Sequence, residues 1–179
     1  MKFFCCETQR LEVIKLSGSA NGIEFLEVRD HLEPMLALRQ RTLFVRLLRS
    51  GVVLTPDNVR IDGGVRLPAV PVEWVAAADN LPAGTDPALV NGIDDLPRTL
   101  VVRTTVFGDF STYTLRLRAS SGSDQPPGGF DPKLSEIQFS FKVECGSDFD
   151  CAQAVPCPPD APATPEIDYR PFIIADADT

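Results

Sequence analysis

Hydrophobic and polar residues alternate along several short segments of this chain, which is the pattern of β-strands with one buried face. The clearest case is the run in which Ile137, Phe139, Phe141 and Val143 alternate with polar residues. Further strands are predicted at 23–28, 42–48, 59–61, 65–67, 71–77, 98–106 and 111–117. No long amphipathic helix is predicted between them. Seven or eight short strands at regular spacing predict an all-β fold, an Ig-like β-sandwich.

Turn-forming residues predict how these strands are connected. Asp62-Gly63-Gly64 separates two apolar runs, so segments 59–61 and 65–67 are predicted to form a tight hairpin. The connection 107–110 contains a flexible glycine and an aspartate, and it predicts a second hairpin, of 98–106 with 111–117. Segment 79–96 is rich in Pro, Gly, Asp and Asn and is interpreted as a long loop. Segment 31–38 contains a proline and is interpreted as a loop, with a single helical turn as the alternative.

The composition changes after the last predicted strand. Residues 156–171 include six prolines, which lack an amide donor and stiffen the backbone, so an extended conformation is expected. The whole chain carries a net charge of −8. Most of this charge lies from residue 146 onward, where there are seven acidic residues and one basic residue. We therefore predict a β-sandwich domain at 1–152 and a Pro-rich acidic tail at 153–179.

Two groups of residues are candidates for binding a partner protein. Arg39 and Arg41 lie in the densest positive cluster, which is either a solvated strand face or a contact surface. Ile167, Tyr169 and Phe172 are apolar residues in the acidic tail, and they either dock on the domain or bind a partner. No basic patch is interleaved with aromatic residues, so nucleic-acid binding is not expected.

The five cysteines are the candidate metal ligands. Cys5 and Cys6 are adjacent near the start of the chain, and Cys145, Cys151 and Cys157 follow the last predicted strand at intervals of six. None of them forms a CxxC pair. Three interpretations stay open: thiols without a ligand, a disulfide such as Cys145–Cys151, or a zinc or iron–sulfur site that combines the two groups.

The sequence contains no catalytic constellation. His31, the single histidine, lies beside Asp30, and no nucleophile motif accompanies it. The glycine pairs are simple turn pairs rather than a phosphate-binding loop. No apolar run approaches the ~20 residues that span a bilayer, and the N-terminus lacks the apolar core of a signal peptide. We expect a non-enzymatic protein that is made in the cytoplasm and does not insert into a membrane.

Several motifs occur in one order along most of the chain: NGIEFLEV (21–28), RQRTLFVRLL (39–48), LTPDNVRIDGG (54–64), GDFSTYTLRL (108–117) and FDPKLSEIQFSFKVECGSDFDC (130–151), with FFCC before them and PEIDY after them. This series resembles the N-terminal region of baseplate assembly proteins, the J-like wedge proteins of phage-tail-like contractile injection systems. The resemblance implies a structural role, with other baseplate, wedge or spike subunits as partners. It transfers no catalytic residue.

In that family the sequence after PEIDY continues into a longer body, whereas here it reads RPFIIADADT. A short relative and a truncated copy are both compatible with this difference. We predict a structural component of a contractile baseplate that acts by protein–protein contacts and ends in an assembled particle. The alternative is an independent Ig-like binding or adhesion module for a carbohydrate or surface ligand, with Phe107 and Phe110 as contact residues.

Overall fold

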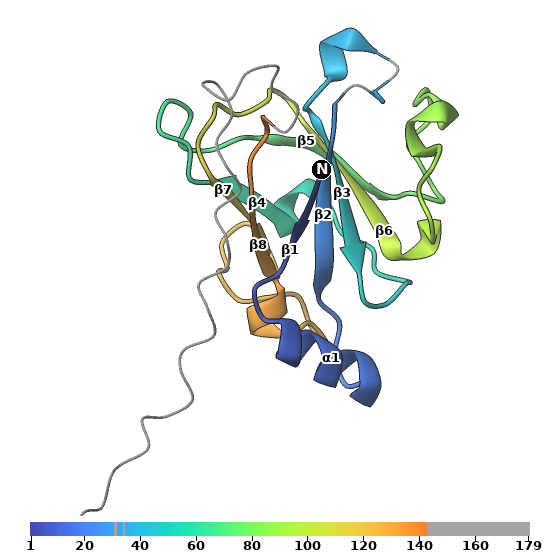
Figure 1. Ribbon diagram of the computed structural model, residues 1–179, viewed down its shortest axis with the longest axis vertical. Helices are drawn as coiled ribbons and strands as arrows, with labels where there is room; N and C mark the ends of the chain where they lie inside the picture. Colours follow the sequence, from blue (N-terminus) through green and yellow to red (C-terminus); the bar gives the residue numbers. More distant parts are fainter. Residues whose placement is uncertain (31, 34, 143–179) are drawn as a thin grey trace, which may run out of the picture.

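The computed structural model describes residues 1–30, 32–33 and 35–142, which form two antiparallel β-sheets packed face to face (Figure 1). The larger sheet has the order β1-β2-β3-β6-β5, with bounds Lys2–Phe4, Ile23–Arg29, Thr42–Leu47, Thr99–Thr104 and Val72–Ala77. The smaller sheet has the order β4-β7-β8, with bounds Val59–Asp62, Tyr113–Leu117 and Glu136–Phe139. Helix α1 spans Thr8–Ser17, and the 3-10 helices η1 to η5 span Leu36–Leu38, Pro56–Asn58, Pro87–Val90, Leu96–Arg98 and Pro132–Leu134.

The strand order confirms the predicted Ig-like sandwich. An immunoglobulin constant-type domain pairs its strands as ABED and CFG. Reading β2 as strand A, the larger sheet contains β2-β3-β6-β5 in the ABED order, and the smaller sheet is β4-β7-β8 in the CFG order. Strand β1 is an addition that pairs antiparallel with β2 at the edge of the larger sheet.

One apolar core fills the space between the sheets. Its members alternate along the strands, as the sequence predicted, and they come from both sheets: Leu26, Val28, Leu43, Val45, Leu47, Ile61, Leu100, Val102, Tyr113, Leu115, Leu117, Ile137, Phe139 and Phe141. The aromatic part of this core is compact, since the ring centroid of Phe141 lies 5.0 Å from that of Tyr113 and 4.9 Å from that of Phe139. Burial of this surface is the main favourable contribution to folding.

Both predicted hairpins are wrong. Strand β6 pairs with β3 and β5, whereas β7 pairs with β4 and β8, so the connection 105–112 crosses from one sheet to the other. Segment 65–67 forms no strand; β4 is instead bridged by residues 68–70, through the isolated bridge between Asp62 and Ala69 and two backbone hydrogen bonds. A period of two identifies the buried face of a strand but not the strand that lies beside it.

The sequence pattern did not indicate β1 or α1. Strand β1 has only three residues, and Ile14 is the single buried residue of α1, so neither element shows a clear apolar face. The helix is capped by Gly18, whose φ of 68° is in the left-handed region that favours glycine. Segment 31–38 contains the helical turn η1, which agrees with the alternative given for that loop.

An ion pair attaches α1 to the β7–β8 connection. Nε and Nη2 of Arg10 donate to the two carboxylate oxygens of Asp131, each at 2.8 Å. The same carboxylate accepts from the amides of Lys133 at 2.9 Å and Leu134 at 3.3 Å, and so caps η5. The side-chain hydrogen bond from Arg10, followed by those from the amides, lowers the pKa of Asp131 below its usual value.

This lowered pKa predicts a pH-dependent contribution of Asp131 to stability. The ionised form is favoured in the folded state, so the contribution is present above the unfolded pKa of about 3.9 and is lost as pH falls through the lower folded pKa. Asp131→Asn should reduce the free energy of unfolding at pH 7 by roughly 1–3 kcal/mol, and the difference from wild type should shrink below about pH 4. Urea titrations across pH measure both values. Asp124→Asn, at a side chain that is 88% exposed, is the control and should show little change. A constant difference from pH 7 to pH 2 would contradict the assignment.

Candidate functional site

Three loops and the exit of β8 meet at one end of the sandwich. The loops are 30–41 between β2 and β3, 63–71 between β4 and β5, and 105–112 between β6 and β7; they lie at the upper end in Figure 1, opposite α1. Seven of the twelve large hydrophobic side chains that are exposed in the described residues belong to these loops. We call this surface the loop end and define it by these side chains: Leu32, Met35, Leu36, Val65, Val106, Phe107 and Phe110.

Lys142, which follows β8, connects two of the loops. Its ammonium lies 4.0 Å from the ring centroid of Phe107 and 5.8 Å from that of Phe110. The same Nζ donates to Oε1 of Gln40 at 2.6 Å, and Nε2 of Gln40 donates to Asp30. Burial lowers the pKa of Lys142. We call the 105–112 loop, which carries Phe107 and Phe110, the aromatic loop. The Lys142 ammonium therefore holds the aromatic loop and the 30–41 loop together.

A hydrogen-bond network fixes the conformation of the aromatic loop. The carboxylate of Asp109 accepts from the amides of Arg66 at 2.8 Å and Ser111 at 2.9 Å, and it lies 3.1 Å from the hydroxyl of Tyr113. Hydrogen bonding by Ser111 first, and then by the amide of Arg66, holds the pKa of Asp109 well below its usual range. Phe107 and Phe110 are 49% and 46% exposed on this bonded loop. A loop that is already ordered loses less conformational entropy when it binds.

The structure separates the two arginines that were predicted as partner-binding residues. Arg41 donates from Nε to the carbonyl of Thr104 at 2.9 Å and from Nη2 to Glu73 at 3.0 Å, so its guanidinium is paired with a carboxylate of the same domain. Arg39 is exposed, and its side chain forms no ion pair with the described residues. The same holds for Arg66 in the 63–71 loop. The other predicted contact residues, Ile167, Tyr169 and Phe172, lie outside the described residues.

Segment 79–98 covers part of the outer face of the larger sheet. Leu89 packs against Phe44 and Val101 in a second apolar cluster. Two arginines of the larger sheet donate hydrogen bonds to the backbone of this segment. Nη2 of Arg29 donates to the carbonyl of Asn91 at 2.8 Å, and Arg46 donates to the carbonyl of Asp94. The predicted long loop is thus a packed cover that contains η3 and η4.

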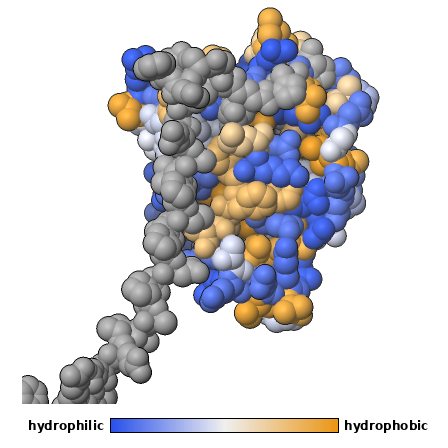
Figure 2. Space-filling view, in the orientation of Figure 1, coloured by the Kyte–Doolittle hydropathy of each residue, from blue (hydrophilic) through white to orange (hydrophobic). Residues whose placement is uncertain are grey.

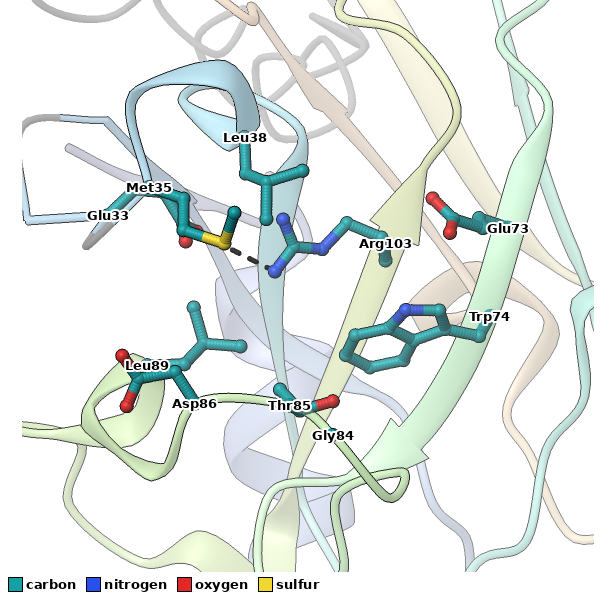
Figure 3. Close-up of a pocket in the computed structure, with 10 residues that line it drawn as sticks. All are labelled: Glu33, Met35, Leu38, Glu73, Trp74, Gly84, Thr85, Asp86, Leu89 and Arg103. Carbon is teal, nitrogen blue, oxygen red and sulfur yellow. Dashed lines mark ion pairs between the residues drawn. The ribbon is translucent and has the colours of Figure 1, made fainter.

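A pocket of about 180 Å³ lies where this cover meets the loop end. Figure 3 shows the guanidinium of Arg103 extending from β6 toward Glu33 and Met35, with Leu38 and Trp74 of β5 on either side of its side chain. Arg103 forms an ion pair with Glu33, with 3.7 Å between Nη2 and Oε2. The two side chains are buried, with exposed fractions of 5% and 3%. Cζ of Arg103 lies 5.6 Å from the Trp74 ring centroid.

The Arg103–Glu33 pair has one further polar partner among the described residues. Thr42 donates to Oε2 of Glu33 at 2.8 Å, and burial lowers the pKa of Arg103. Nη1 of Arg103 is buried and has no hydrogen-bond partner among the described residues. Among the described residues, the polar side chains of the lining are those of Glu33, Glu73, Thr85, Asp86 and Arg103, besides the Trp74 indole.

Another apolar patch is visible in the middle of the face that carries β1 and β2 (Figure 2). Phe4 of β1 packs on Phe25 of β2, with 5.8 Å between the ring centroids. Lys2 and Arg46 lie over the Phe25 ring at 4.7 and 5.5 Å. This cluster is therefore already supplied with cationic neighbours.

The cysteines divide into two described and three that lie outside the described residues, Cys145, Cys151 and Cys157. Cys5 is a buried free thiol, and burial raises its pKa. Cys6 is disulfide-bonded, so its sulfur is not available there as a thiolate ligand. Within the described ranges, no three His, Cys, Asp or Glu side chains are placed to hold a metal ion. A zinc or iron–sulfur site stays a prediction. The described residues also include no helix that is long and apolar enough to cross a membrane.

Because the Arg103–Glu33 pair is buried, removing one partner should destabilise the fold strongly, and replacing both partners should restore much of the stability. Glu33→Ala should reduce the free energy of unfolding by about 3–5 kcal/mol, because it leaves the guanidinium buried without a counter-charge. The double variant Glu33→Leu/Arg103→Met should recover much of that loss, because an apolar pair of similar volume avoids the desolvation penalty. Urea denaturation of the four proteins of this cycle measures both effects. A double variant that is as unstable as the sum of the single variants would contradict the pairing.

Comparison with known proteins adds to this geometry. A family model described as "Phage baseplate assembly protein, N-terminal domain" matches residues 1–139. No curated protein matches the chain. Among solved structures, the crystal structure of the S-layer protein rSbsC(31-844) matches with 15% identity and a TM-score of 0.42, over 74% of this chain and 15% of that chain; a likeness this weak carries no argument. Because the family model spans 139 of the 179 residues, this chain belongs to the family of phage baseplate assembly protein N-terminal domains.

Proposed function

We propose that this chain is a structural component of the baseplate of a phage-tail-like contractile particle and that it acts through protein–protein contacts. The observation that carries the proposal is the match of a baseplate assembly family model to residues 1–139. The partners would be other baseplate, wedge or spike subunits. The chain would be made in the bacterial cytoplasm and then be incorporated into the particle. No catalytic activity is part of the proposal.

The loop end is the surface that best fits such contacts. It gathers exposed apolar side chains, two of them aromatic, beside Arg39 and Arg66, whose guanidinium groups form no ion pair with the described part of the chain. Aromatic residues and arginine are enriched at the centres of protein interfaces. The hydrogen bonds of Asp109 hold Phe107 and Phe110 in place before binding. The surface therefore combines apolar area with low conformational freedom, as a contact in a stable assembly requires.

A second candidate function rests on the same exposed aromatic rings. Phe107 and Phe110 are about half exposed on an ordered loop, and such rings also stack on sugar faces. An independent adhesion module for a carbohydrate or surface ligand would use them in that way. The two functions differ in what the loop end binds, so one pair of variants separates them.

Affinity capture with the tagged chain tests the proposal. Wild type should retain at least one sheath, wedge or spike protein of the same particle, and Phe107→Ser/Phe110→Ser should weaken that association about tenfold or more, because two central aromatic contacts are removed. Val13→Ser/Leu16→Ser is the matched control, since these α1 side chains are 63% and 89% exposed at the opposite end. It should bind like wild type.

Circular dichroism of each variant shows whether the fold is intact. Failure of the wild-type chain to associate with any particle protein would contradict the baseplate role. Binding to a glycan array that the Phe107→Ser/Phe110→Ser variant loses, without binding to particle proteins, would support the adhesion module instead.

A further inference from the structure

The pocket that Arg103 and Trp74 line, which we call the Trp74 pocket, holds a buried guanidinium with too few acceptors. The Arg103 side chain is 5% exposed, and its Nη1 is buried without a hydrogen-bond partner among the described residues. Nη2 lies 3.7 Å from Oε2 of Glu33, which is longer than a hydrogen bond. A buried charged donor without an acceptor is costly, so its presence in a pocket indicates that a ligand supplies the acceptor.

The size and the walls of the Trp74 pocket fit one large apolar side chain. Its volume is about 180 Å³, whereas pockets for cofactors and drug-sized molecules measure roughly 300–1,000 Å³. Met35, Leu38 and Leu89 supply apolar walls, and the ring of Trp74 supplies a flat one (Figure 3). Met35 also belongs to the loop end, so the pocket adjoins that surface. An anchor residue of a partner polypeptide therefore fits the pocket better than a cofactor does.

The charges around the pocket favour a neutral acceptor over a carboxylate. Among the described residues that line it, Glu33, Glu73 and Asp86 carry carboxylates, and Arg103 carries the guanidinium. An incoming carboxylate would therefore meet like charges as well as Arg103. A carbonyl oxygen would accept from Nη1 without that repulsion. A cationic head group would be attracted by the carboxylates, but it would be repelled by Arg103 and would leave Nη1 without an acceptor.

We infer that the Trp74 pocket binds one large apolar residue of a partner polypeptide, and that a neutral carbonyl of this polypeptide accepts a hydrogen bond from Nη1 of Arg103. The apolar side chain would contact Met35, Leu89 and the Trp74 ring. Pockets that take one anchor side chain are the places where binding energy concentrates in protein interfaces. That the polypeptide is another baseplate subunit rests on the proposed function, whereas the chemistry of the pocket does not.

NMR titration of the full chain with a small probe tests the inference. Trp74 is the only tryptophan in the sequence, so its indole N–H gives a single signal that reports on the pocket. N-acetyl-leucinamide carries one apolar side chain and neutral carbonyls, and it should shift this signal with a Kd of roughly the millimolar range, as expected for a ligand of about a dozen atoms. N-acetyl-leucine, which has a carboxylate in place of the amide, and N-acetyl-argininamide should each bind at least about threefold more weakly.

Variants of the lining show whether the probe binds in the pocket. Glu33→Leu/Arg103→Met keeps an apolar pair of similar volume and removes the donor, so it should bind N-acetyl-leucinamide about tenfold or more weakly. Thr85→Phe should also weaken binding, because it fills the pocket and leaves the Arg103–Glu33 pair in place. Arg39→Met is the matched control, since Arg39 is exposed and does not line the pocket, and it should bind like wild type. Circular dichroism shows whether each variant is folded.

No shift of the Trp74 signal at probe concentrations well above the millimolar range would overturn the inference. Equal binding by wild type, Glu33→Leu/Arg103→Met and Thr85→Phe would overturn it as well. Tighter binding of N-acetyl-leucine or N-acetyl-argininamide would do the same, since the occupant would then be charged. The titration contains no particle protein. Probe binding without capture of a baseplate subunit would therefore contradict the proposed function alone, and capture without probe binding would contradict the pocket assignment alone.

Discussion

The burial of Tyr113, where the chain crosses from one sheet to the other, determines how the sandwich closes. Its ring is fully buried and packs against Phe139 and Phe141, and its hydroxyl accepts from the amide of Asp109 and lies 3.1 Å from the carbonyl of Leu67. A tyrosine at the start of strand F that bonds back to the preceding corner is a feature of Ig-like domains. One side chain thus joins the core, the aromatic loop and the 63–71 loop.

Two glycines make room for this tyrosine. A Cβ atom on Gly64 would lie 2.0 Å from the Tyr113 hydroxyl, and one on Gly108 would lie 2.6 Å from its ring and 2.4 Å from Phe141. Any larger residue at either position would have to displace the core. Gly108 and Asp109 both contact Tyr113, and the phenylalanines on either side of this pair, Phe107 and Phe110, are about half exposed. The proposed contact surface is therefore a consequence of how the sandwich closes.

The sequence predicted which faces of the strands are buried but not which strands are neighbours. Alternation at 113–117 and 137–141 placed Tyr113, Leu115 and Phe139 in the core correctly, because a period of two is a local property. The pairing of β6 with β5 is not local, and the glycine and aspartate of the 107–110 connection serve a corner between sheets as well as they would serve a hairpin. Helix α1 was not predicted because Ile14 is its single buried residue, so its sequence shows no clear apolar face.

The site was predictable to a similar degree. Phe107 and Phe110 could be singled out as aromatic residues in a turn, whereas their exposure depends on the Tyr113 corner. Nothing in the sequence near Arg103 indicates a buried cation, since its partner Glu33 lies in a distant loop and its contact with Trp74 arises only from the pairing of β5 with β6.

Photo-crosslinking in assembled particles can show whether the loop end is a baseplate contact. A benzophenone amino acid in place of Phe110 should crosslink to another baseplate subunit, and the same group in place of Leu16 should not. Crosslinks from position 16 with none from position 110 would contradict the account.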